Sequence, residues 1–296
     1  MSFRPFTDFI HIGALRKGAL ATFALLLAGC TQLFFFPQRG MLDSPERYGV
    51  KYEVEDFKAA DGVSLNAWFF PAQGKEVTGR DEAPKPTVLF LHGNAENIST
   101  HFRSIAWLPA EGYNVLALDY RGYGASEGQP TLAGIMLDID AAMGRLQAHA
   151  GVDPKRIVIY GQSLGGALAV HYAAHTAYRS SVRALVIDSA FYDYRQISRE
   201  KLAGSALTWA FQWLPWLAID DDYSPAKSIA AIAPMPLLLI QGDKDAVVPP
   251  RHAQELFEHA GEPKQLWIVP GAGHTQALGS AEVRKRLVEY LKRYTG

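Results

Sequence analysis

The stretch Gly161-Gln162-Ser163-Leu164-Gly165-Gly166 decides the fold of this chain. It follows an apolar run, residues 157–160, and precedes an alanine-rich stretch typical of a helix. A strand that turns so abruptly into a helix places one serine at the apex. The glycines around it leave space for the neighbouring strand and helix. The sequence therefore predicts that Ser163 is a nucleophile exposed at the end of a strand.

A serine hydroxyl becomes a good nucleophile only when a base takes its proton and an acid orients that base. His274 lies in a glycine-rich loop near the C-terminus, after a strand-like run. Asp245 lies in a loop after the apolar run 237–240. We expect His274 to be the base and Asp245 the acid. Asp243, two residues earlier, and Asp188, after the preceding strand, remain alternatives for the acid.

Attack on a carbonyl group builds negative charge on its oxygen, so hydrogen-bond donors must already face that oxygen. The stretch His92-Gly93-Asn94 follows the apolar run 87–91 and predicts a tight turn. We assign the oxyanion hole to the backbone N–H groups of Asn94 and Leu164. Leu164 directly follows the nucleophile and begins a helix, whose dipole adds positive potential.

These motifs resemble those of the α/β-hydrolase superfamily, in which the order serine, acid, histidine is the same. The resemblance covers nearly the whole chain after residue 85. Within the superfamily, the chain looks most like small serine hydrolases with a reduced cap, which include membrane-associated thioesterases and depalmitoylases. In the matching segment 119–126 we expect Asp119, Arg121 and Ser126 to clamp a loop beneath the site, with an ion pair between Asp119 and Arg121.

The order of apolar runs predicts an α/β fold. Residues 50–57 and 64–70 alternate apolar and polar positions around Asp61-Gly62, as in an antiparallel hairpin. Strands and helices then alternate, which is typical of parallel βαβ units. We expect an eight-stranded, mostly parallel sheet with helices on both faces. The six later strands are predicted at residues 87–91, 113–118, 157–160, 184–187, 237–240 and 265–268.

Residues 191–225 interrupt this alternation with many aromatic side chains and the acidic run Asp220-Asp221-Asp222. They lie between two predicted strands, at the place where relatives in the superfamily insert a cap. We expect a short cap here that covers the serine with an apolar acyl or aromatic pocket. The alternative is that these rings only pack against the core.

The first residues predict a leader outside the fold. Basic residues precede a short apolar stretch, 19–28, which ends in Leu27-Ala28-Gly29-Cys30 and is too short for an ordinary membrane span. This ending resembles a bacterial lipobox. We expect a signal peptide at residues 1–29, a lipid on Cys30, a membrane-proximal tether at residues 30–47 and a hydrolase domain at residues 48–296.

Two alternatives to this interpretation remain: an uncut signal anchor, and a buried, unmodified Cys30. By resemblance to lipoproteins, Thr31 in place of an aspartate favours the outer membrane, facing the periplasm. Residues 33–37 could lie on the membrane surface or pack beneath the domain.

Composition excludes other classes. The chain has 29 basic and 30 acidic residues and no basic patch, so we do not expect a nucleic-acid partner. The single cysteine, Cys30, excludes an intrachain disulfide bond. We predict no metal and no organic cofactor, and the sequence leaves the oligomeric state open.

The pattern as a whole predicts a serine hydrolase that cleaves small acyl esters or thioesters through an acyl-enzyme intermediate. A peptidase or acyltransferase using the same three residues is the first alternative. The second is a non-catalytic lipoprotein that binds a partner.

Overall fold

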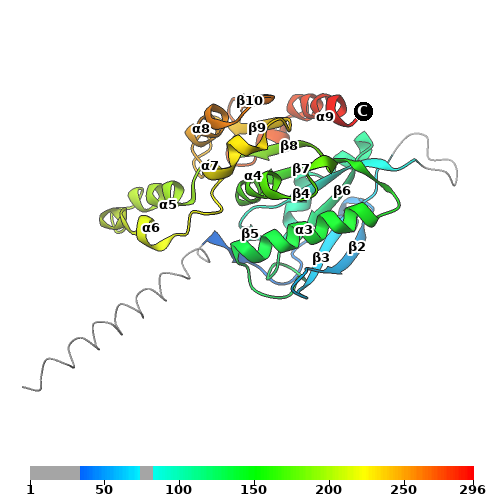
Figure 1. Cartoon of the computed structure of the whole chain (residues 1–296), viewed down its shortest axis with the longest axis horizontal. Coiled ribbons are helices and arrows are strands. Elements are labelled where there is room, and N and C mark those ends of the chain that lie inside the picture. Colours follow the sequence, from blue (N-terminus) through cyan, green and yellow to red (C-terminus); the bar gives the residue numbers. More distant parts are fainter. Residues whose placement is uncertain (1–33, 74–82) are drawn as a thin grey trace, which may run out of the picture.

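The computed structural model describes residues 34–73 and 83–296, so the predicted signal peptide and Cys30 lie outside the described residues. Its centre is an eight-stranded sheet in the order β10-β9-β8-β7-β4-β6-β3-β2, which confirms the predicted fold class (Figure 1). All neighbouring strands run parallel except the pairs β2–β3 and β3–β6. The strands are β2 (Glu53–Lys58), β3 (Ser64–Phe70), β4 (Lys85–Leu91), β6 (Asn114–Leu118), β7 (Val152–Gln162), β8 (Val182–Asp188), β9 (Leu237–Gly242) and β10 (Lys264–Val269).

Helices cover both faces of this sheet because alternate strand residues point to opposite sides. Leu89 on β4 belongs to the apolar cluster that includes residues of α3, α4 and α8 on one face, whereas Phe90 belongs to the cluster that includes residues of α2 and α9 on the other. The central strands are buried on both sides and therefore read as continuous apolar runs. The helices are α2 (Ile98–His101), α3 (Leu132–Ala148), α4 (Leu164–His175), α5 (Tyr194–Ala203), α6 (Leu214–Ala218), α7 (Pro225–Ser228), α8 (Arg251–His259) and α9 (Ala281–Thr295).

The described part of the expected tether packs on the domain. Strand β1 (Phe36–Pro37) pairs in parallel with β5 (Ala95–Glu96), the strand that follows the predicted oxyanion turn. Phe35 is buried, and Asp43 forms an ion pair of 2.9 Å with Arg103. From residue 34 onward the chain is therefore held on the domain by the β1–β5 pairing, the buried Phe35 ring and this ion pair.

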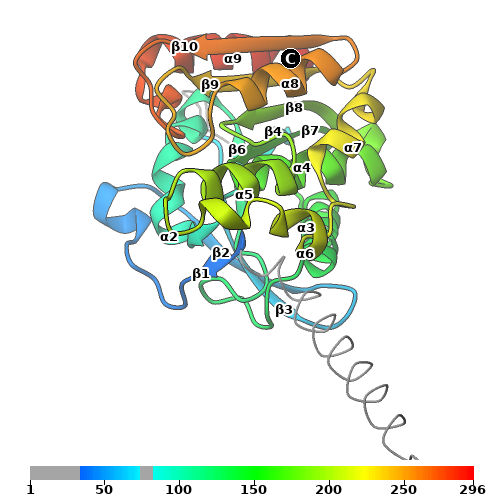
Figure 2. The same ribbon diagram turned by 90° about the vertical axis from the view of Figure 1, so that its left-hand side faces the viewer.

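Helices α5 and α6 come between β8 and β9 in the sequence. They project from one end of the molecule (Figures 1 and 2). We refer to residues 194–218 as the α5–α6 insertion. It falls within the range 191–225 in which the sequence predicts a cap. Across residues 34–73 and 83–296, every helix is too short or too polar to span a bilayer.

Candidate active site

Ser163 stands at the end of β7, directly before the first residue of α4. Its φ of 54° and ψ of −119° are strained values for a residue with a side chain. A methyl group on Gly161 would collide with the carbonyl of Gly165, and one on Gly165 would collide with the carbonyl of Leu91. The two glycines are therefore required for the sharp turn that presents the serine.

The structure brings the three predicted catalytic side chains together. His274 Nε2 lies 3.0 Å from Ser163 Oγ, and His274 Nδ1 lies 2.8 Å from Asp245 Oδ2. With Nδ1–H donating to the carboxylate, Nε2 is free to accept the serine proton. These contacts have the geometry that general-base activation of a serine requires.

Asp245 is held in an ionised state by donors from its own loop. Burial acts to raise its pKa, but the hydrogen bond from His274, together with those from Val248 and Gln241, outweighs burial and lowers the pKa. The backbone N–H groups of Val247 and Val248 donate to Oδ1 at 2.9 and 2.8 Å, and Gln241 Nε2 donates to Oδ2 at 3.0 Å. The carboxylate is thus fixed with one oxygen aimed at the imidazole.

Asp188, an alternative candidate for the acid, has different hydrogen-bond partners. Asp188 is fully buried, and burial raises its pKa against the hydrogen bonds that it accepts from Gln162, Ser189 and Tyr160. Ser189 Oγ in turn accepts the backbone N–H of Thr275, at 3.0 Å, next to the histidine. Asp188 therefore braces the loop that carries the base.

The two predicted oxyanion donors lie beside the nucleophile. Asn94 and Leu164 line the same cavity as Ser163. Within the described residues, neither backbone N–H donates a hydrogen bond, whereas the Asn94 carbonyl accepts the Phe36 N–H at 2.9 Å and the Tyr123 hydroxyl at 2.8 Å. These two bonds hold the Asn94 carbonyl in place, and the Asn94 N–H remains available as a donor.

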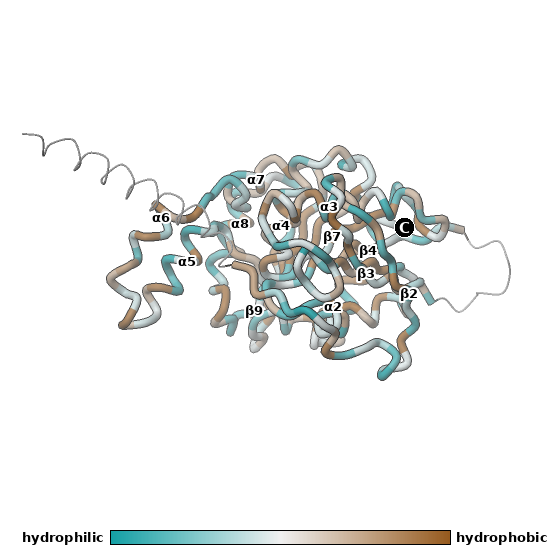
Figure 3. Tube along the Cα trace, turned by 90° about the horizontal axis from the view of Figure 1, so that it is seen from below, coloured by the Kyte–Doolittle hydropathy of each residue, from teal (hydrophilic) through white to brown (hydrophobic). Residues whose placement is uncertain are grey.

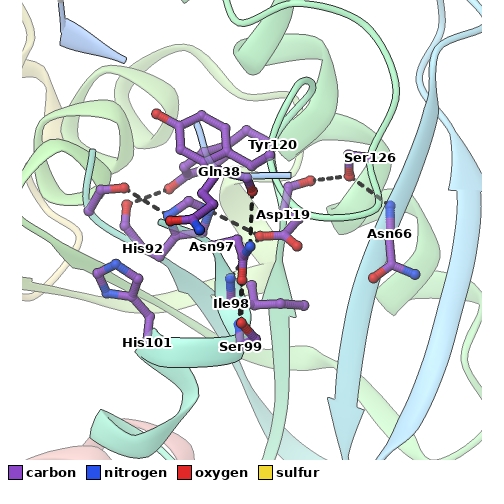
Figure 4. A network of polar contacts seen from close by, with 12 residues as sticks. Gln38, Asn66, His92, Asn97, Ile98, Ser99, His101, Asp119, Tyr120 and Ser126 are labelled. Atoms are coloured by element: carbon purple, nitrogen blue, oxygen red, sulfur yellow. Dashed lines mark hydrogen bonds and ion pairs between the residues drawn. The ribbon is translucent and has the colours of Figure 1, made fainter. Parts of the chain in front are cut away.

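A network of buried polar contacts supports the turn His92-Gly93-Asn94 (Figure 4). The Tyr120 hydroxyl donates to the His92 carbonyl at 3.0 Å, and Asp119 Oδ1 accepts the Ile98 N–H at 2.8 Å. His92 Nε2 lies 3.4 Å from the same carboxylate oxygen. Ser126 Oγ donates to the Asp119 carbonyl at 2.7 Å. His92 and Asp119 therefore shape the turn.

The expected ion pair between Asp119 and Arg121 is wrong. Arg121 Nη2 lies 2.8 Å from Asp138 Oδ1 on α3, and Nη1 lies 2.7 Å from Asp61 Oδ2 in the β2–β3 hairpin. Although only Tyr120 separates Asp119 from Arg121 along the chain, the two side chains point to different partners. Arg121 does clamp the loop, but it does so between the hairpin and α3.

An apolar cavity of about 490 Å³ opens above the serine, within the range of small-molecule sites. The α5–α6 insertion supplies much of its wall, and Phe34 and Phe36 supply another part. Lys201 is the single charged side chain among the residues that line it. The lining residues are Phe34, Phe36, Asn94, Ser163, Leu164, Phe191, Ile197, Ser198, Lys201, Leu202, Leu214, Pro215, Ala218, Ile219, Val247 and Val248.

Among residues 34–73 and 83–296, one group of side chains outside the cavity has metal-ligand chemistry. Ligand atoms of Glu53, Glu55 and His149 lie within 4.8 Å of one another at the sheet edge formed by β2. Arg145 Nε already donates to Glu55 at 2.6 Å, which neutralises part of the negative charge. β2 is the edge strand and Ser163 follows the central β7, so this group is not part of the catalytic arrangement.

Comparisons with known proteins agree with this fold. The family model described as "Serine aminopeptidase, S33" matches residues 82–230, and that of "TAP-like protein" matches residues 211–295. The chain belongs to the α/β-hydrolase superfamily.

Particular relatives support the assignment. The uncharacterized protein YfhR of Escherichia coli is 33% identical over 261 residues, which is 87% of this chain and 86% of YfhR. The crystal structure of the Pyrococcus furiosus esterase Pf2001 matches 89% of this chain and 98% of its own, with a TM-score of 0.69 and 26% identity. A puromycin-hydrolyzing peptidase of Mycobacterium tuberculosis shares the fold, at 20% identity and a TM-score of 0.63 over 84% of this chain and 40% of its own.

The sequence did not reveal every residue at the site. Phe34 and Phe36 lie more than a hundred residues before the serine, and nothing in their spacing links them to it. Gln241, which holds Asp245, carries a weak signal: a buried polar residue directly before Gly242 at the end of an apolar strand. Such a residue needs a partner, and the adjacent catalytic loop provides one.

Proposed function

We propose that this protein is a serine hydrolase that cleaves carboxylic esters or thioesters through an acyl-enzyme intermediate. The observation that carries the proposal is the hydrogen-bonded chain from Asp245 through His274 to Ser163, which ends at the base of an apolar cavity. The Pf2001 esterase, with a matching fold over almost its whole chain, supports the same reaction class.

In the first half-reaction, Ser163 Oγ attacks the carbonyl carbon while His274 Nε2 takes the hydroxyl proton. The negative charge that develops on the carbonyl oxygen is stabilised by the N–H groups of Asn94 and Leu164. Collapse of the tetrahedral intermediate breaks the bond to the alcohol or thiol, which leaves with the proton from His274. The acyl group is then bound to Ser163.

In the second half-reaction, a water molecule attacks the acyl carbon and gives its proton to His274. The tetrahedral intermediate collapses, and His274 returns the proton to Ser163 Oγ. The carboxylic acid leaves and the enzyme is regenerated. Asp245 keeps the imidazole in the correct tautomer and stabilises the transient imidazolium in both halves.

The cavity favours esters over aminopeptidase substrates. An aminopeptidase binds a free ammonium group, for which a carboxylate in the pocket is the natural partner. Among the residues that line the cavity there is no Asp or Glu, and Lys201 would repel an ammonium group. A peptidase or acyltransferase reaction on the same three residues is the second candidate, favoured by the description of the matching family model.

The decisive experiment compares p-nitrophenyl esters and acyl thioesters with aminoacyl-p-nitroanilides. We expect measurable turnover of the first two and none of the third. A fluorophosphonate probe should label the wild type and the control Ser205→Ala, which changes an exposed serine, but not Ser163→Ala. Equal labelling of Ser163→Ala would contradict the nucleophile assignment.

We also propose that the enzyme is anchored in a bacterial cell envelope by a lipid on Cys30 and faces the periplasm. The lipobox-like Leu27-Ala28-Gly29-Cys30 supports this anchor. The resemblance of the hydrolase motifs to those of membrane-associated thioesterases and depalmitoylases makes lipid-linked acyl groups the preferred substrates. Metabolic labelling with an alkyne fatty acid should mark the wild type and not Cys30→Ser. Equal incorporation in both would exclude the lipid anchor.

A further inference from the structure

The α5–α6 insertion contains an unusually long stretch without charge. From Leu202 to Ile219, eighteen consecutive residues include no Asp, Glu, Lys or Arg. A surface segment of a water-soluble protein normally carries charged side chains throughout. The hydropathy colouring shows apolar residues along this end of the molecule, at and before α6 (Figure 3).

Much of this stretch is exposed. Six large apolar side chains have exposed fractions between 50% and 89%. At ~200 Å² for each side chain, they expose roughly 600 Å² or more, which reaches the ~300–600 Å² of the largest apolar patch on a typical monomer. The six residues are Leu207, Trp209, Phe211, Trp213, Trp216 and Leu217.

Part of the patch is the outer surface of the pocket wall. On the short helix α6, Leu214, Pro215 and Ala218 line the cavity above Ser163. Trp216 and Leu217, between them, are more than half exposed. A surface that meets the patch is therefore separated from the acyl cavity by one helix.

Charged groups around the patch suit an anionic surface. Arg199 and Lys201 precede it and are exposed, and neither forms an ion pair with a described residue. The acidic run follows it at the other end. There, Asp221 is buried and Asp222 is ion-paired with Lys227 at 2.9 Å, whereas Asp220 is exposed.

The beginning of the described chain lies on the same side. The Phe34 ring packs against Tyr194 of α5, with a centroid distance of 4.8 Å, and lines the cavity. Cys30 is four residues earlier, so at most ~14 Å of extended chain separates it from this wall. The lipid anchor proposed above would therefore enter the membrane beside the α5–α6 insertion. Of the observations that support the inference, only this one depends on that anchor.

We propose that the patch of Leu207, Trp209, Phe211, Trp213, Trp216 and Leu217 is a membrane-docking surface, which lies in the interface of a phospholipid bilayer. Tryptophan prefers this interface because its ring is apolar while its N–H remains at the polar headgroups. The exposed Lys201, directly before the uncharged stretch, then faces anionic headgroups at the mouth of the cavity. An acyl substrate passes from the bilayer past α6 into the cavity.

The test uses the full-length protein mixed with vesicles of phosphatidylethanolamine and phosphatidylglycerol that carry brominated acyl chains. Bromine quenches tryptophan fluorescence only at close range, and three of the six tryptophans belong to the patch. We expect the wild type to lose roughly a third or more of its emission. The test variant is Trp209→Tyr/Trp213→Tyr/Trp216→Tyr, whose emission the brominated lipid should not quench. The matched control is Trp107→Tyr/Trp267→Tyr, whose emission should still be quenched.

A second pair of variants tests the surface itself. Trp209→Glu/Leu217→Glu should bind vesicles at least tenfold more weakly in the Cys30→Ser background, since charge is disfavoured at this depth. Both side chains are more than half exposed, so the variant should fold with an unchanged circular dichroism spectrum. Ser163→Ala should dock as the wild type does, so docking and catalysis can fail separately.

Two results would overturn the proposal. One is vesicle-bound wild type without any quenching by brominated lipid, which would mean that the upstream chain alone holds the protein on the membrane. The other is a dimer in sedimentation equilibrium that is lost in Trp209→Glu/Leu217→Glu, which would make the patch a contact between two copies of the chain.

Discussion

The Asp243 carboxylate accepts a hydrogen bond of 2.6 Å from the backbone N–H of Gly271, in the loop that carries His274. Two backbone bonds run beside it, from the Asp243 N–H to the Val269 carbonyl and from the Lys244 N–H to the Ala272 carbonyl. The loop of the acid and the loop of the base are therefore one rigid unit. Asp243 contributes to it as a brace, while Asp245 contacts the imidazole.

This division of roles predicts different kinetics for the three carboxyl groups. Asp245→Asn should lower kcat by roughly 10²–10⁴, because the imidazole loses its orienting anion. Asp243→Asn and Asp188→Asn should each lower it by about tenfold or less, because they act through the loop. The measurement is kcat for a short p-nitrophenyl ester in the three variants. A larger loss in Asp188→Asn than in Asp245→Asn would move the acid to strand β8.

The apolar wall of the cavity predicts a preference for longer acyl groups. Each methylene that enters the cavity is worth about 0.8 kcal/mol, so kcat/KM should rise about fourfold per methylene from acetate until the cavity is filled. Ala218→Phe on α6 should remove this gain for long esters and leave acetate hydrolysis nearly unchanged. Ala203→Phe, on the exposed end of α5, is the control. An identical chain-length profile in Ala218→Phe would show that the acyl group binds elsewhere.

The position of the Phe34 ring predicts that the N-terminal segment takes part in substrate binding. The ring packs on Tyr194 and lines the cavity, so Phe34→Ala should lower kcat/KM for long esters by roughly tenfold or more through loss of apolar contact. Labelling of Ser163 by a small fluorophosphonate should persist. Tyr48→Ala, which changes a ring outside the cavity, serves as the control. Equal losses for short and long esters would instead indicate a general loss of structure.

The lowered pKa values of His101 and His171 predict how the stability of the fold depends on pH. Burial, followed by the proximity of His92, lowers the pKa of His101 to about 4, and burial, followed by His175, lowers that of His171 to about 4. Between pH 6.5 and 4 the unfolded chain then binds more protons than the folded one. Stability should be full above pH 6.5 and fall as the pH decreases to 4, by at most about 3 kcal/mol per site.

The melting temperature between pH 4 and 7 measures this effect. His101→Gln and His171→Gln should each flatten the profile, whereas His259→Gln, at an exposed position, should leave it as steep as in the wild type. A profile that stays equally steep in both buried-site variants would contradict the prediction.

The two ion pairs of Arg121 lead to a prediction about the stability of the fold. Asp138→Ala would leave the Arg121 guanidinium without its buried partner on α3 and should cost roughly 3–5 kcal/mol of unfolding free energy. Asp61→Ala removes a half-exposed partner and should cost about 1 kcal/mol or less. Chemical denaturation measures both. Similar costs for the two variants would show that burial does not control this ion pair.

The sequence contained enough to predict the sheet and the contact of Ser163 with His274 and of His274 with Asp245. Apolar runs such as 237–240 are strong signals because central parallel strands are buried on both faces. Ser163, Asp245 and His274 each stand in a loop after such a run, and parallel strands bring those loops to one edge of the sheet. Contact between residues 111 positions apart thus follows from strand order.

Other features depend on side-chain direction, which local sequence does not determine. Asp119 and Arg121 are close along the chain, yet burial draws the arginine to Asp138 and the aspartate to the Ile98 N–H. Likewise, Phe34, Phe35 and Phe36 form one apolar run, but the first and third line the cavity and the second enters the core. The pairing of β1 with β5 decides this, and a two-residue strand has no recognisable pattern.

That short pairing has a mechanical consequence. The Phe36 N–H bonds to the Asn94 carbonyl and the Gln38 N–H bonds to the Glu96 carbonyl, so the first described strand is attached directly to the oxyanion turn. Tension applied to the N-terminal chain would be borne by these two bonds before it reached the rest of the sheet. An enzyme tethered through this end would carry its load at the point where the transition state is held.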